Sequence, residues 1–136
     1  MYHFVFVTKY RKVVLSHEVD IVMRQICLEI EKRYEIHFLE IGTDENHVHF
    51  LIQTKPVYSP AKIVQIIKSI TAREIFKQRP EVKLKLWGGQ FWTDGYYVNT
   101  VASYGSENAV RDYIKSQGKK PEYQELHRSD PTLFNY

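Results

Sequence analysis

The chain has 136 residues, of which 43% are hydrophobic, 26% charged and 14% aromatic. This length suits one domain, and the composition excludes disordered, collagen-like and coiled-coil proteins. No apolar run approaches the roughly 20 residues that a membrane-spanning helix needs, and the N-terminus lacks the pattern of a signal peptide. We therefore expect one soluble cytoplasmic domain over residues 1–136, without membrane partners and with a polar, irregular C-terminal tail over residues 118–136.

The formal net charge of +3 conceals a basic middle segment. Between residues 55 and 85, eight Lys and Arg side chains stand against two acidic ones, a balance of +6. A segment of this kind suits a polyanionic partner such as nucleic acid. Solvated lysines on the surface of a helix give the same pattern, so charge alone leaves both interpretations open.

The first half of the chain predicts a strand, a helix and a hairpin. Residues 2–8 are aromatic and β-branched, which is typical of a buried strand. Ser16 can cap a helix that runs to about Tyr34, because apolar residues then recur at helical spacing. Two further strands follow at residues 36–43 and 47–54, joined by a short turn.

The second half adds two helices and one strand. A helix is predicted from Ser59 to about Gln78, ended by Pro80, then a strand over residues 96–102 and a helix over residues 106–117. This order indicates an α+β fold, a ferredoxin-like βαββαβ sandwich with an antiparallel sheet and an added C-terminal helix. Two helices would cover one face of the sheet and leave the other face for something else.

Two histidines in the predicted hairpin form the most informative pattern in the chain. Alternation along a strand sends His47 and His49 to one face of the sheet, and Val48 and Phe50 to the other. The apolar side suits the helix-covered face, so the imidazoles would lie on the free face, where two of them can chelate one metal ion. Histidines that merely decorate a strand would give the same pattern.

A metal site of this kind needs a third ligand. On the last predicted helix, Tyr113 and Gln117 are four residues apart and project from one face. Gln117 can supply an oxygen to the metal, and Tyr113 a nucleophile beside it. The chain has ten tyrosines, so the pattern alone does not select Tyr113 over Tyr96, Tyr97 or Tyr104.

A tyrosine nucleophile and a metal ion together suit attack on a phosphodiester. The ordinary pKa of a tyrosine hydroxyl is about 10, so the attack needs a metal that neutralises the phosphate. The product is a phosphotyrosine ester, which preserves the bond energy for rejoining without ATP. In agreement, the sequence contains no P-loop motif, and it has no H-E-x-x-H, no G-x-S-x-G and no cysteine pair.

These residues belong to an ordered set of motifs by which the chain closely resembles a known family. The motifs are HFVFVTKYR (residues 3–11), TDENHVHFL (43–51), LWGGQFWTDGYY (86–97) and YIKSQ (113–117). They resemble those of the single-tyrosine HUH transposases, the TnpA-type, IS200-like enzymes of bacterial insertion sequences that move as single-stranded DNA. The resemblance covers the chain to about residue 128.

The resemblance implies a site and a reaction. His47, His49 and Gln117 would bind a divalent metal, Mg²⁺ or Mn²⁺, and Tyr113 would cleave DNA to give a 5′-phosphotyrosine and a free 3′-hydroxyl. The family's partners are DNA hairpins near the ends of the element. Its members are homodimers in which histidines of one subunit meet the tyrosine helix of the other. Many relatives have Asp where this chain has Asn46, which leaves the role of a carboxylate there open.

Charge, aromaticity and position also nominate residues for contacts with DNA. They are Arg11, Lys62, Lys68, Arg73, Lys77 and Trp92.

Two other functions fit the same order of elements. One is a noncatalytic, RRM-like module that binds single-stranded nucleic acid, in which Tyr2, Phe4 and Phe50 would stack bases. The K/R-G-F/Y-G/A-F-V-x-F/Y signature of that module is missing from the third strand. The other is a small-molecule or regulatory ferredoxin-like domain in which the histidine pair only binds a metal.

Overall fold

The computed structural model of the chain describes residues 1–55, 57–86, 89–101 and 124–125. The strands are β1 (Tyr2–Val7), β2 (Ile36–Thr43), β3 (His47–Thr54), β4 (Tyr97–Thr100) and β5 (Gln124–Glu125). The helices are α1 (His17–Arg33), α2 (Pro60–Gln78) and α3 (Pro80–Lys85), and a 3₁₀ turn covers Lys9–Arg11. No helix within the described ranges is long and apolar enough to cross a membrane.

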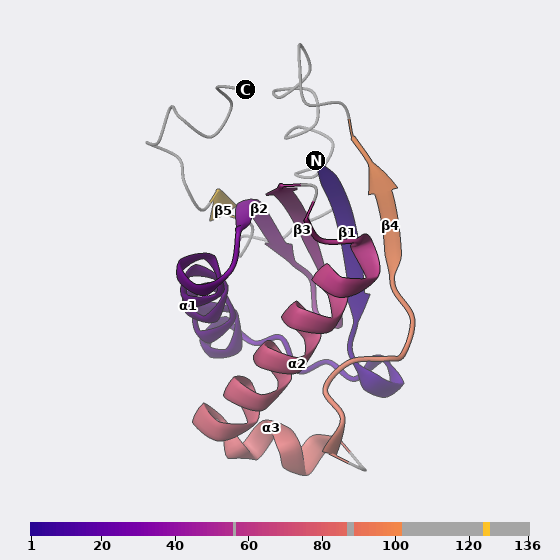
Figure 1. The fold of residues 1–136 in the computed structure, drawn as a ribbon. Helices are drawn as coiled ribbons and strands as arrows, with labels where there is room; N and C mark the ends of the chain where they lie inside the picture. Colours follow the sequence, from indigo (N-terminus) through magenta and orange to yellow (C-terminus); the bar gives the residue numbers. More distant parts are fainter. Residues whose placement is uncertain (56, 87–88, 102–123, 126–136) are drawn as a thin grey trace.

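The strands form one antiparallel sheet in the order β4-β1-β3-β2-β5. Helices α1 and α2 lie side by side against one face of this sheet (Figure 1). The first four strands and these two helices make the βαββαβ arrangement of a ferredoxin-like sandwich. The predicted fold class is therefore confirmed.

The observed elements differ from the predicted ones mainly in the second half of the chain. Strand β4 is shorter than the strand predicted over residues 96–102, and Pro80 begins the short helix α3 as well as ending α2. Strand β5 pairs with β2, so the prediction of an irregular tail over residues 118–136 is wrong at Gln124–Glu125. The helix predicted over residues 106–117 lies outside the described residues.

Serine hydroxyls begin both long helices. The Oγ atom of Ser16 accepts a hydrogen bond from the backbone N–H of Val19 (3.3 Å), and that of Ser59 accepts one from Lys62 (3.1 Å). Each bond satisfies a donor that the first helical turn leaves without an intrahelical partner. Pro60 stands in the first turn of α2, where its missing N–H costs nothing.

The hydrophobic core lies between the sheet and the two long helices. Phe4 and Phe6 of β1 and Phe50 of β3 are fully buried in it, and Phe4 lies directly opposite Phe50 in the strand register. Burial of each such ring contributes about 1.5–3 kcal/mol to stability. Because Phe4 and Phe50 lie in the core, they cannot stack bases, and the RRM-like alternative is wrong on this point.

Contacts from α2 hold the segment that leads into β4. The indole Nε1–H of Trp92 donates to Oγ1 of Thr71 over 2.9 Å, and Trp92 is only 5% exposed. The ammonium group of Lys68 donates to the carbonyl oxygens of Thr93 (2.7 Å) and Gly95 (2.8 Å). The start of β4, and with it this edge of the sheet, is thereby fixed to α2.

Candidate functional site

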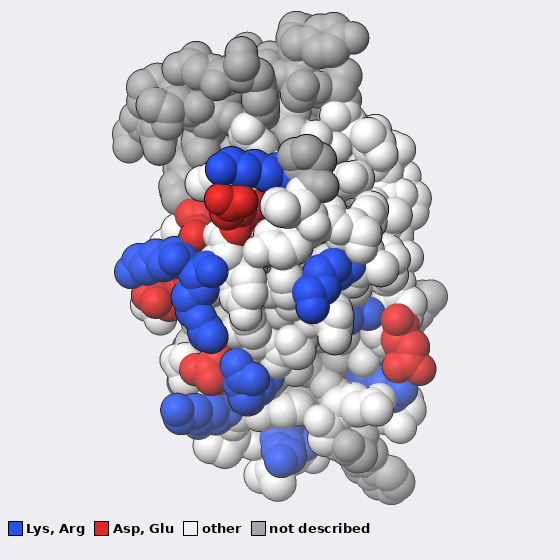
Figure 2. Space-filling model, viewed as in Figure 1, with Lys and Arg blue, Asp and Glu red and all other residues white. Residues whose placement is uncertain are grey.

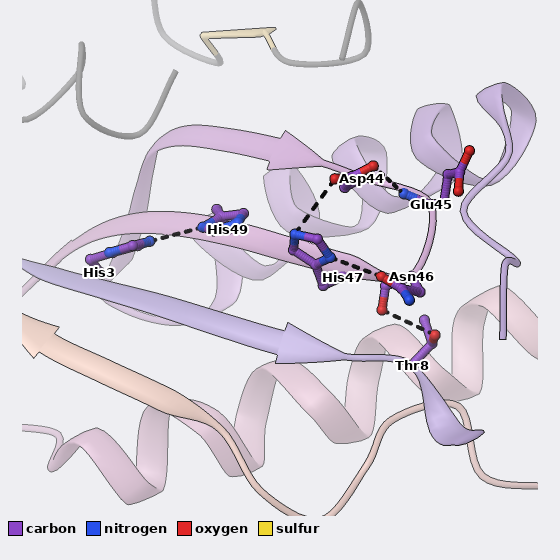
Figure 3. A network of polar contacts seen from close by, with 7 residues as sticks. All are labelled: His3, Thr8, Asp44, Glu45, Asn46, His47 and His49. Atoms are coloured by element: carbon purple, nitrogen blue, oxygen red, sulfur yellow. Dashed lines mark hydrogen bonds and ion pairs between the residues drawn. The ribbon is translucent and has the colours of Figure 1, made fainter. Parts of the chain in front are cut away.

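Strand β3 places His47 and His49 on the face of the sheet opposite the helices, as predicted (Figure 3). Val48 and Phe50, which alternate with them, lie in the hydrophobic core. The ring centroids of the two histidines are 5.1 Å apart. His49 is 5% exposed, whereas the side chain of His47 is 28% exposed, so the pair has one deep ring and one ring accessible to solvent.

The face of the sheet opposite the helices is buried at its centre. Leu51 lies on the same face as His49, and its cross-strand partner on β2 is Glu40. Both side chains are fully buried. Tyr97 on β4 is 49% exposed. On this face, therefore, side chains of β2 and β3 are buried, whereas a side chain of β4 is exposed to solvent.

The ring of His47 is held by its neighbours in the preceding turn. Its Nδ1–H donates to the side-chain oxygen of Asn46 over 2.9 Å. Its other nitrogen, Nε2, lies 3.8 Å from Oδ2 of Asp44 (Figure 3). Asn46 thus sets the orientation and tautomer of the ring, and it leaves the Nε2 lone pair beside a carboxylate.

The ring of His49 is held by a histidine of the neighbouring strand. Nδ1 of His49 and Nε2 of His3 share a hydrogen bond of 3.0 Å between two buried side chains. The strand register explains the contact, because Val5 lies opposite His49 and His3 is the next residue of β1 on the same face. In both histidines of the pair, therefore, Nδ1 is engaged within the protein.

The turn before His47 is fastened to the end of β1. The carbonyl oxygen of Asn46 accepts a hydrogen bond from the backbone N–H of Thr8 (2.9 Å). The hydroxyl of Thr8 lies 3.1 Å from the same oxygen and 2.7 Å from the carbonyl oxygen of Lys12, so the two oxygens share its proton. Within the turn, the backbone N–H of Asp44 donates to the carbonyl oxygen of His47 (2.9 Å), and Oδ1 of Asp44 accepts from the N–H of Glu45 (2.8 Å). Asp44 and Asn46 therefore occupy fixed positions beside the histidine pair.

Burial keeps the inner histidines neutral. It lowers the pKa of His49 from 6.5 to about 4, with smaller contributions from the nearby His3 and His47, and Asp44 opposes the shift. Burial also lowers the pKa of His3. Neutral imidazole is the form that binds a metal ion, so His49 is ready to act as a ligand at neutral pH without losing a proton.

The donor set suits a divalent ion and is incomplete within the described part of the chain. Imidazole nitrogens can come from His47 and His49, and the carboxylate of Asp44 lies beside His47. Mn²⁺ can bind both kinds of group. No group of three His, Cys, Asp or Glu side chains in residues 1–55, 57–86, 89–101 and 124–125 is placed to hold a metal ion. The predicted third ligand, Gln117, and the predicted nucleophile, Tyr113, lie outside the described residues.

Three of the residues nominated for contacts with DNA are exposed on α2. They are Lys62, Arg73 and Lys77. Nε of Arg73 lies 3.7 Å from a carboxylate oxygen of Glu74. Lys and Arg side chains are spread over the helix-covered face of the molecule, with Asp and Glu beside several of them (Figure 2). The positive charge on this face is therefore confined to patches. The side chain of Arg11, which was also nominated, is not among those that the structure describes.

The structure gives the other two nominated residues a different role. Trp92 lies in the hydrophobic core, where it packs against Phe6 with ring centroids 5.4 Å apart, so its ring is not presented to DNA. The ammonium group of Lys68 is bound by backbone carbonyl oxygens, and burial lowers its pKa. The buried ring of Trp92 corrects its nomination as a DNA contact. Lys68 holds the segment before β4 and is half-buried, and its contact with DNA stays a prediction.

Sequence reasoning missed the contact between His3 and His49 and the part that Thr8 plays. His3 and Thr8 lie in the first motif, but no role followed from their spacing to the histidine pair, since 46 residues separate His3 from His49. The only available signal was alternation, which puts His3 on the face opposite Phe4. The position of His3 beside His49 depends in addition on the register of β1 against β3, which alternation within one strand does not give.

The lowered pKa of His49 predicts a loss of stability in acid. The unfolded chain takes up a proton near pH 6.5, whereas the folded chain resists it down to about pH 4. The unfolded state thus binds more protons in this window, so the free energy of unfolding is expected to fall as the pH is lowered through it. Urea denaturation of the metal-free protein at several pH values measures this fall. The fall in the free energy of unfolding should be smaller in His49→Gln than in the control His37→Gln, which changes an exposed histidine of β2. Equal falls in the two variants would contradict the prediction.

Comparison with known proteins identifies the family. A model of the family "Transposase IS200 like" matches residues 1–117. The ISDra2 transposase TnpA of Deinococcus radiodurans is 32% identical over 119 residues, which are 88% of this chain and 84% of that protein. The transposase of insertion sequence element IS200 from Salmonella typhimurium is 29% identical over 120 residues, which are 85% of this chain and 75% of that protein.

Solved structures agree with this comparison. A candidate transposase from Deinococcus radiodurans aligns with a TM-score of 0.69 at 29% identity, over 85% of this chain and 88% of that one. A REP-associated tyrosine transposase bound to a REP hairpin aligns with a TM-score of 0.55, over 99% of this chain and 81% of that one. At 12% identity the second likeness shows the fold alone. Because the family model spans most of the chain and includes the histidine pair, the chain belongs to the IS200-like transposase family.

Proposed function

We propose that the chain is a metal-dependent transposase that cleaves and rejoins single-stranded DNA at the ends of an insertion sequence through a 5′-phosphotyrosine intermediate. The observation that carries the proposal is the arrangement of the histidine pair. In His47 and in His49, a neighbouring side chain engages Nδ1, so that Nε2 is the nitrogen on the side away from this contact in both rings. Membership of the IS200-like family supports the class of reaction.

In this proposal His47, His49 and Gln117 hold Mg²⁺ or Mn²⁺. The carboxylate of Asp44 lies 3.8 Å from Nε2 of His47 and adds negative charge beside this ligand. A divalent ion there neutralises the scissile phosphate and stabilises the charge that develops during attack. Asn46 and His3 act one step further out, since each holds the ring of a ligand histidine in place.

Tyr113 is the proposed nucleophile. Its hydroxyl oxygen attacks the phosphorus, the bond from phosphorus to the 3′ oxygen breaks, and the hydroxyl proton passes to the leaving oxygen. The products are a 5′-phosphotyrosine and a free 3′-hydroxyl. Rejoining is the reverse attack of a 3′-hydroxyl on the phosphotyrosine, and it needs no ATP.

The proposed DNA ligand is a hairpin of single-stranded DNA at the end of the element. A protein of the same fold was solved with a REP hairpin bound, which supports this choice. Lys62 and Lys77 are exposed on α2 and are proposed to contact phosphates. Contacts of this kind supply affinity and position the DNA without reading its sequence.

We also propose that the active protein is a homodimer. Strand β4 is at the edge of the sheet, and Tyr96, Tyr97 and Val98 at its start are exposed large side chains. Edge strands with exposed apolar side chains are surfaces on which a second chain can dock. A dimer would allow the histidine pair of one subunit to work with Tyr113 of the other.

The proposed nucleophile predicts a covalent adduct. The wild-type protein, incubated with a labelled single-stranded hairpin from the end of an element and with Mg²⁺, is expected to yield a protein–DNA adduct on a denaturing gel. The adduct should be absent with EDTA, in Tyr113→Phe and in His49→Ala. It should persist in the matched controls Tyr104→Phe and His37→Ala. An adduct in Tyr113→Phe would move the nucleophile elsewhere, and tight hairpin binding without any adduct would indicate a noncatalytic binding module.

A shared active site predicts complementation between inactive variants. Tyr113→Phe lacks the nucleophile, and His49→Ala lacks a metal ligand. In a mixed dimer one site combines the intact histidines of the first variant with the intact tyrosine of the second. Mixing and exchanging the two proteins is therefore expected to restore adduct formation, on the chain that carries His49→Ala. No adduct from mixed dimers, verified by differential tagging, would place both groups of a site on the same subunit.

The proposed phosphate contacts of α2 predict a change in salt dependence. The double variant Lys62→Glu/Lys77→Glu should bind the hairpin more weakly, and the slope of log K against log salt should fall by about 1.4–1.8 for two lost contacts. Fluorescence anisotropy at several salt concentrations measures both quantities. The control Lys83→Glu/Lys85→Glu changes the charge of exposed α3 residues equally. The same slope in the α2 variant as in the wild type would exclude α2 from the interface.

A further inference from the structure

His3 is a buried polar side chain whose surroundings tie it to one atom of the candidate site. It is 2% exposed, and it lies on β1 on the same face as the histidine pair. Its Nε2 is 3.0 Å from Nδ1 of His49. The ring of Tyr97 on β4 stands edge-on to it, with centroids 5.7 Å apart. The ring of His3 therefore has a defined place between β3 and β4.

The two imidazoles meet edge to edge, which is the geometry of a hydrogen bond rather than of stacking. Their planes differ by 18° and their centroids are 5.3 Å apart, while the facing nitrogens are 3.0 Å apart. Both nitrogens therefore lie close to the line between the ring centres. Since N–H bonds and lone pairs of imidazole lie in the ring plane, the N–H of one ring points at the lone pair of the other.

Two neutral imidazoles can share this bond in only two ways. If Nε2 of His3 donates, His49 carries its own proton on Nε2 and cannot use that nitrogen for a metal ion. If Nδ1 of His49 donates, Nε2 of His49 keeps its lone pair and is free to bind a metal. His47 already has the second arrangement, because its Nδ1 faces the side-chain oxygen Oδ1 of Asn46, which can only accept.

We propose that His3 is a positioning residue: it accepts the Nδ1–H of His49 and so holds His49 in the tautomer whose Nε2 binds the metal. The choice between the two arrangements rests on the proposed metal-dependent function. His3 itself does not touch the metal or the DNA in this assignment. It acts through His49, as carboxylates and backbone carbonyls do behind other metal-bound histidines.

The tautomer is measured directly on the metal-free protein. Long-range ¹H–¹⁵N correlation spectra at neutral pH distinguish the protonated from the unprotonated nitrogen of each ring. We expect Nδ1 of His49 to be protonated and its Nε2 to be unprotonated, in the wild type and in His3→Gln, whose side-chain oxygen can accept the same hydrogen bond. A wild-type spectrum with the proton on Nε2 of His49 would overturn the proposal, whether or not the protein binds a metal.

Metal affinity gives a second, independent readout. His3→Phe keeps a ring of similar shape on β1 and removes the acceptor. It is expected to bind Mn²⁺ about 10- to 100-fold more weakly than the wild type, measured by titration with EPR detection of free Mn²⁺. His3→Gln should bind nearly as well as the wild type. Equal affinities of His3→Phe and wild type would overturn the proposal, as would a loss in His3→Gln as large as that in His3→Phe.

The two experiments separate this inference from the proposed function. Circular dichroism and thermal unfolding establish that each variant is folded before its affinity is compared. If His3→Phe does not fold, the tautomer in the wild type and in His3→Gln decides the role of His3. If the folded wild type binds no Mn²⁺, the proposed metal site fails, and the same spectra still decide whether His3 sets the tautomer of His49.

Discussion

The pairing of β1 with β3 is the constraint on which both faces of the sheet depend. Its register sets Phe4 opposite Phe50 and Val5 opposite His49. Because side chains alternate along a strand, this register sends the aromatic rings into the core and the imidazoles to the other face. A slip by one residue would exchange the two sets. It would place His49 among apolar side chains and remove Phe50 from the core, with a loss of about 1.5–3 kcal/mol for that ring alone.

The same strand pair brings the residues of the candidate site together. Asn46 stands at the end of the turn that begins β3, and its carbonyl oxygen is held by Thr8 just after β1. Its side-chain oxygen holds His47, while His3 near the start of β1 contacts His49. Each histidine of the pair is therefore oriented by a different part of the chain. Because these contacts all come from β1, β3 and the residues that flank them, the geometry of the candidate site does not depend on the exposed surface of α2.

Burial gives the two histidines different characters. His47 is accessible and lies beside a carboxylate, whereas His49 is deep and is held neutral by burial, with its pKa lowered to about 4. Burial also lowers the pKa of Lys68, which extends from α2 on the helix-covered face. Its ammonium group donates hydrogen bonds to the backbone carbonyl oxygens of Thr93 and Gly95. A basic side chain in this fold can thus be part of the scaffold, and charge counted along the sequence overstates the surface offered to a polyanion.

The sequence by itself determined the order of β1, α1, β2, β3, α2 and β4, the fold class and the face of β3 on which His47 and His49 lie. These follow from local physics: helical spacing, serine caps and strand alternation act over a few residues and can be read along the chain. It did not determine that His3 meets His49, that Thr8 holds Asn46, that Trp92 lies in the core, or that Lys68 binds the segment before β4. Those facts join residues from different elements, and strand register and helix packing decide which of them meet. Only the tertiary structure carries that information, because a shift of one residue in register leaves the local pattern of each strand unchanged while it replaces every contact between strands.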